Sequence, residues 1–84
     1  MEYKVMITDT DTGKDYETLV KVRSDATIKR VVLKAVEQVV ENISPDSLEF
    51  MREVNYMYRE AYDSDEFVEQ LKIDLDLVVT WEEV

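Results

Sequence analysis

The most constraining feature of this sequence is a strand pattern that leads directly into the only long amphipathic segment of the chain. Residues 16–23 form the strand, and Ser24 or Asp25 is able to cap the helix that follows. The helix is predicted from about Thr27 to Asn42, and it ends at Ile43-Ser44-Pro45-Asp46. Its apolar residues recur at helical spacing: Ile28, Val31, Val32, Ala35, Val36, Val39 and Val40. Valine is a poor helix former, so packing against a sheet must hold this helix.

A β-hairpin is predicted before the helix. Tyr3, Val5 and Ile7 alternate with polar or exposed positions, which is typical of a half-buried strand. Residues 9–15 contain the only glycine, so we expect the positive-φ position of the turn at Gly13. The return strand directs Val20 and Val22 toward the core.

The second half of the chain is less uniform. Residues 46–62 fit either one helix or two short strands. Asp63-Ser64-Asp65-Glu66 resembles a capping box, and it predicts a single helical turn that carries Phe67, Val68 and Leu71. Alternation of Leu75, Leu77, Val79 and Trp81 with their neighbours predicts a final strand.

Length and composition indicate one domain over residues 1–84. Apolar residues make up 45% of the chain, which is enough for a packed core. The sequence contains no cysteine and no histidine, so disulfides and thiolate or imidazole metal sites are excluded. Since no apolar run approaches transmembrane length and no signal-peptide pattern precedes the first strand, we expect a cytoplasmic protein.

The net charge of −10 is concentrated in the last third of the chain. Residues 1–59 carry 9 basic and 11 acidic side chains, whereas residues 60–84 carry 9 acidic side chains and one basic side chain, Lys72. Such a field repels phosphate backbones, so we expect no nucleic-acid partner. It is compatible with a basic protein partner, or with a solvated acidic surface that favours solubility.

Four short motifs, in order, resemble those of ubiquitin-like proteins. Thr12-Gly13-Lys14 is similar to the hairpin turn of ubiquitin, and Ser24-Asp25-Ala26-Thr27-Ile28 resembles its helix-opening segment with one residue inserted. Ile43-Ser44-Pro45-Asp46 resembles the Ile-Pro-Pro-Asp that closes the ubiquitin helix. Val68, Leu71 and Ile73 have the spacing of its short second helix. Small type VII secretion accessory proteins and small monooxygenase subunits also look similar in length and layout.

The resemblance implies an α+β fold of the ubiquitin-like β-grasp type. We then expect a mixed four- to five-stranded sheet packed on one long helix, with a short helical turn near residues 64–72. The first and last strands would pair in parallel at the centre, and residues 46–62 would form two strands. The alternative is a second helix over residues 46–62 on a three-stranded sheet. Because the chain ends at Trp81-Glu82-Glu83-Val84 without Gly-Gly, conjugation is not expected.

The resemblance also implies a protein-interaction module, an adaptor that docks through the exposed face of its sheet. Met51 and Thr80 match two members of the apolar recognition patch of ubiquitin by position. Met6 and Val78 would be their neighbours, so the predicted protein-binding residues are Met6, Met51, Val78 and Thr80. Scattered exposed apolar residues are the plainer interpretation of the same positions.

Other functions are less well supported by the residues. Enzyme activity, a cofactor and a small-molecule substrate are not expected, because carboxylates such as Glu60 and Asp63 have no histidine, cysteine or other base beside them. Asp9, Asp11 and Asp15 lack the distal glutamate of a calcium loop. Two alternatives remain: an accessory subunit of a secretion or enzyme complex, and an acidic inhibitor or immunity-type protein that blocks a basic cleft with residues 60–84.

Overall fold

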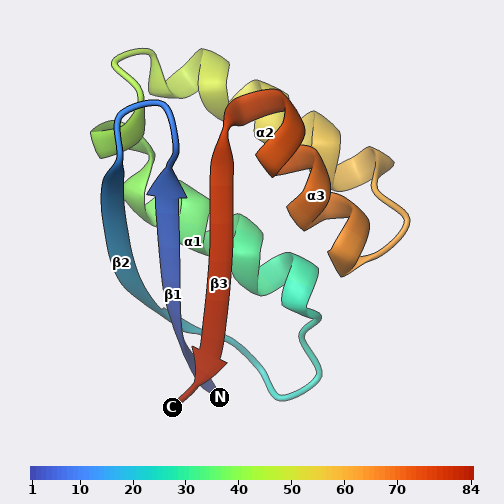
Figure 1. The fold of residues 1–84 in the computed structure, drawn as a ribbon. Coiled ribbons are helices and arrows are strands. Elements are labelled where there is room, and N and C mark those ends of the chain that lie inside the picture. The colour runs from blue at the N-terminus through green and yellow to red at the C-terminus, as the bar shows by residue number, and fades with distance from the viewer.

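Three helices lie on one side of a three-stranded sheet, and the other face of the sheet is open (Figure 1). The computed structural model describes all 84 residues. Their elements, in chain order, are β1 (Glu2–Asp9), β2 (Lys14–Lys21), α1 (Ile28–Ile43), α2 (Ser47–Glu60), α3 (Ser64–Leu75) and β3 (Leu77–Glu83).

The sheet has the order β2-β1-β3, with antiparallel pairing on both sides of β1. The predicted hairpin is confirmed: Gly13 has φ 76°, and its N–H donates to the carbonyl oxygen of Asp9 at 2.7 Å. Met6 stands between Glu17 of β2 and Thr80 of β3 in the register. Val5 and Ile7 are fully buried, so one face of β1 points to the helices.

The predicted β-grasp fold is wrong. The sheet has three strands rather than four or five, three helices replace the single long helix, and β3 pairs antiparallel to β1 rather than parallel. Residues 46–62 do not form two strands but the helix α2, which is the alternative that the sequence left open. This additional helix reverses the chain once more, so β3 descends beside β1 in the opposite direction (Figure 1).

Local signals explain why α2 forms. The side chain of Asp46 caps the helix by accepting a hydrogen bond from the N–H of Glu49 at 3.1 Å. Val54 is fully buried, and three partly buried neighbours in helical register pack against the same core: Phe50, Met57 and Tyr58. Leu48, which a strand would have directed inward, is 74% exposed.

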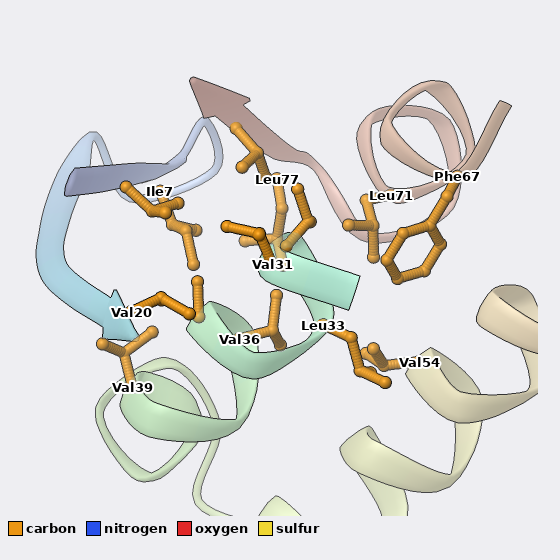
Figure 2. Close-up of a cluster of buried hydrophobic side chains, with 14 of the residues drawn as sticks. Ile7, Val20, Val31, Leu33, Val36, Val39, Val54, Phe67, Leu71 and Leu77 are labelled. Carbon is orange, nitrogen blue, oxygen red and sulfur yellow. The ribbon is translucent and has the colours of Figure 1, made fainter. Parts of the chain in front are cut away.

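Helix α1 packs against β1 and β2 of the sheet and also against α2 and α3, which explains its wide stripe of valines. Helix α3 packs on β3 as well, whereas α2 packs mainly on the other two helices. In Figure 2, Val20 of the sheet lies near Val39, whereas Leu33 of α1 lies beside Val54 of α2. The helix is capped by Thr27, whose hydroxyl accepts from the N–H of Arg30 at 3.1 Å, and not by Ser24 or Asp25 as predicted.

Helix α3 is a full helix of 12 residues rather than the single turn predicted near residues 64–72. The capping residue is Asp63, as the sequence indicated: its carboxylate accepts from the N–H of Glu66 at 2.9 Å. Phe67 and Leu71 of this helix are fully buried in the hydrophobic core (Figure 2). The helix ends at Asp76, in the left-handed region with φ 56°, so β3 begins at Leu77 and Leu75 belongs to the helix.

Candidate functional site

The open face of the sheet, here called the outer face, brings three of the four predicted binding residues together. Met6 and Thr80 are cross-strand partners, and Val78 pairs with Thr8 two residues further along the same strands. Their neighbours Val5, Ile7 and Val79 point to the core, so Met6, Thr80 and Val78 share the opposite face.

Met51 is not on this face. It belongs to α2, where it is half-buried and packs against the hydrophobic core. The prediction placed Met51 on a third strand, and that strand does not exist. The apolar patch predicted by analogy with ubiquitin therefore loses one of its two members matched by position.

Charged side chains on the outer face form ion pairs across the strands. The Nζ of Lys4 lies 3.4 Å from Glu17 and 3.3 Å from Glu82, on the two strands that flank β1. Hydrogen bonding to Glu82 and then to Glu17, followed by Coulomb attraction, raises the pKa of Lys4 above its ordinary value. Lys21 lies 3.7 Å from Glu2 in the same way. This face offers little unbalanced charge to a partner.

A groove of about 640 Å³ lies between α2 and α3, and it differs from the outer face in charge. Its lining includes a single cation, Arg52, and three apolar or aromatic residues: Tyr56, Met57 and Ala61. Five carboxylates surround them: Glu49, Glu53, Glu60, Glu66 and Asp74. This set of residues, completed by Gln70, is called the acidic groove below.

Helical spacing aligns the two walls of the acidic groove. On α2 the lining residues follow Glu49 at steps of three and four, so they share one side of the helix. On α3, Glu66, Gln70 and Asp74 are separated by four residues each and form a matching row. From Glu49 to Glu60 the wall rises about 16 Å, or three turns.

Two of the five carboxylates have no partner within the chain. Glu49 pairs with Arg52 at 3.3 Å, and Glu66 accepts from the backbone N–H of Tyr62 at 3.2 Å. Asp74 accepts a hydrogen bond from the side-chain amide of Gln70. Glu53 and Glu60 accept no hydrogen bond and form no ion pair. Arg52 is already engaged, so the groove has a net negative charge with no free cation.

A cluster around Lys29 joins the start of α1 to the loop between the two walls. The Nζ of Lys29, at the start of α1, donates to the carbonyl of Ala61 at 2.8 Å and lies 4.5 Å from the ring centre of Tyr58. The ring of Tyr58 meets Phe67 of α3 edge-on at 5.5 Å. The hydroxyl of Ser64 accepts from the N–H of Lys29 at 2.9 Å. One side chain thus holds the loop between α2 and α3 against α1.

Sequence reasoning located the acidic excess but not the groove. It assigned the excess to residues 60–84, whereas two of the five carboxylates of the groove, Glu49 and Glu53, precede that segment. The missed signal was the helical spacing of Glu49, Glu53 and Glu60, which places them on one side of a helix.

The structure contains neither a candidate metal site nor a membrane-spanning helix. The chain has no group of three or more histidine, cysteine, aspartate or glutamate side chains able to hold a metal ion. None of its helices has the length and apolar character needed to cross a membrane. Comparison of the chain with family models, curated proteins and solved structures finds no match. The resemblance to ubiquitin-like proteins therefore rests on the short motifs alone.

Proposed function

We propose that this protein is a binding module that docks on a positively charged partner protein through the acidic groove. The observation that carries the proposal is the coincidence of five carboxylates, one paired arginine and an apolar floor in a single groove. Protein partners are recognised where apolar contact and charge complementarity coincide. The sequence predicted an acidic inhibitor that acts through residues 60–84, whereas the proposed binding surface is the acidic groove on α2 and α3.

Electrostatics favour this surface over the rest of the molecule. The two helices, α2 and α3, carry seven acidic and three basic side chains. Lys4 and Lys21 of the sheet, in contrast, are paired with adjacent carboxylates. A positive partner is therefore steered toward the helical side, and its association rate falls as salt is added.

Charge reversal in the groove tests the proposal. The probe is a fluorescent peptide of leucine and lysine, and the variant is Glu53→Lys with Glu60→Lys. Because both residues are exposed and unpaired, the variant should fold normally. Each reversal replaces an attraction by a repulsion, at about 0.5–1 kcal/mol per contact. We expect binding, measured by anisotropy at physiological salt, to weaken about tenfold.

The matched control is Glu37→Lys with Glu41→Lys on α1. These residues are also exposed, lie outside the groove and change the net charge by the same amount. Lysine near the C-terminus of α1 is favourable to the helix dipole, so stability is preserved. Because these charges lie outside the groove and salt screens exposed charges over about 8 Å, we expect an effect of about twofold or less. Equal weakening by both variants would contradict a groove-specific interaction.

A second candidate function uses the outer face. Met6, Val78 and Thr80 are adjacent there, and all the helices lie on the other side. An accessory subunit or adaptor that docks through this face would bind by apolar contact, with little response to salt. Met6→Asp together with Thr80→Asp should abolish such binding and leave peptide binding in the acidic groove unchanged. Loss of groove binding in this variant would argue against two separate surfaces.

A further inference from the structure

Both walls of the acidic groove are α-helices, and this limits the shape of the segment that it can receive. The backbone N–H and C=O groups of α2 and α3 are bonded within their own helices or capped at the ends. An extended peptide usually gains affinity by pairing its backbone with the free edge of a sheet. The groove offers no such edge, so an extended occupant would leave its own backbone groups without protein partners. A helix satisfies these groups internally.

Side chains in the groove match the face of an amphipathic helix. Tyr56, which is 59% exposed, and the half-buried Met57 form an apolar strip along α2. Carboxylates lie on both sides of the groove, with Glu53 and Glu60 from α2 and Asp74 from α3. The complementary surface is an apolar stripe flanked on both sides by lysine or arginine, over about three helical turns. Polyproline recognition needs an aromatic-lined groove, and Tyr56 is the single aromatic residue here.

A second copy of this chain is a poorer occupant. The exposed side of α2 that carries Leu48, Arg52 and Arg59 is basic and partly apolar. Of its two cations, Arg52 already pairs with Glu49 of the same chain. Each copy also has a net charge of −10, which opposes association.

Resting on the function proposed above, we infer that the acidic groove binds a basic amphipathic α-helix of a partner protein. The helix lies between α2 and α3 as a third helix of a small bundle. Its apolar stripe contacts Tyr56 and Met57, and its flanking cations pair with the free carboxylates of Glu53 and Glu60.

The test compares two peptides of the same composition. One is a peptide of leucine and lysine with helical period, about four turns long. The other has the same sequence, but two central lysines are D-lysine, which breaks the helix without a change of charge. We expect the first peptide to bind at least tenfold more tightly and to gain helical circular dichroism on binding. We expect Glu53→Lys with Glu60→Lys to remove this preference.

The outcomes separate the two proposals. If both peptides bind with equal affinity and the groove variant binds neither, the occupant need not be helical. That result would overturn the inference and leave the acidic groove as the binding site. Binding of neither peptide would overturn the function itself. Full binding of the helical peptide to the groove variant would place the interaction elsewhere and overturn both. Self-association of the protein alone, with changes confined to α2, would identify a second copy as the occupant and contradict the inference.

Discussion

Replacing Val54 by alanine tests whether residues 46–62 form a helix that packs on α1. Val54 is fully buried beside Leu33, and it is the single fully buried residue of α2 (Figure 2). Removing its two methyl groups costs about 1.5 kcal/mol in transfer free energy, and the cavity adds roughly 1 kcal/mol. Alanine is the better helix former and returns roughly 0.5 kcal/mol. We expect a net loss of about 2 kcal/mol.

Leu48→Ala is the matched control for Val54→Ala. Leu48 is 74% exposed, so its truncation should cost less than about 0.5 kcal/mol. In the two-strand interpretation the order reverses, because Leu48 would be inward-facing and Val54 would lie between the strands. Urea unfolding followed by circular dichroism and by Trp81 fluorescence measures both variants, with unchanged m-values as the test of two-state behaviour. A larger loss for Leu48→Ala than for Val54→Ala would refute the packing described here.

Two further predictions concern single lysines. Lys29→Met removes the hydrogen bond to the Ala61 carbonyl and should reduce the free energy of unfolding by about 1–2 kcal/mol. Arg30→Met, at an exposed neighbour, should change it by less than about 0.5 kcal/mol, and urea unfolding compares the two. The raised pKa of Lys4 means that its ion pairs stabilise the fold below the ordinary lysine pKa and are lost as the pH rises through the folded value. Thermal unfolding from about pH 9 to about pH 12 should therefore decline more steeply for wild type than for Lys4→Met, and parallel curves would contradict this.

The elements with strong local signals could be predicted from the sequence. Gly13 supplied the hairpin turn, and the valine stripe gave α1 to within one residue at each end. Alternation in the last strand and in β1 placed Met6, Val78 and Thr80 on one face. This placement held even though the strands pair antiparallel rather than parallel, because the side of a residue depends on its own strand period.

The middle of the chain could not be predicted, because its local pattern fits two structures. Taken alone, the pattern of Tyr56-Met57-Tyr58 is typical of a strand. In the structure, however, Phe50, Val54 and Met57 share one side of a helix. The resemblance to ubiquitin-like motifs favoured two strands for residues 46–62, and this prediction is wrong. The acidic groove depends on how α2 and α3 pack, and spacing within one segment carries no information on that.

The most direct test of the account is to locate the bound peptide on the wild-type protein. Amide chemical shifts are followed while the helical leucine–lysine peptide is added at physiological salt. We predict that the largest changes lie between Glu49 and Ala61, along α2 and its C-cap, and between Glu66 and Asp74 on α3. Changes centred on Met6 and Thr80 of the outer face, with the helices unaffected, would contradict it.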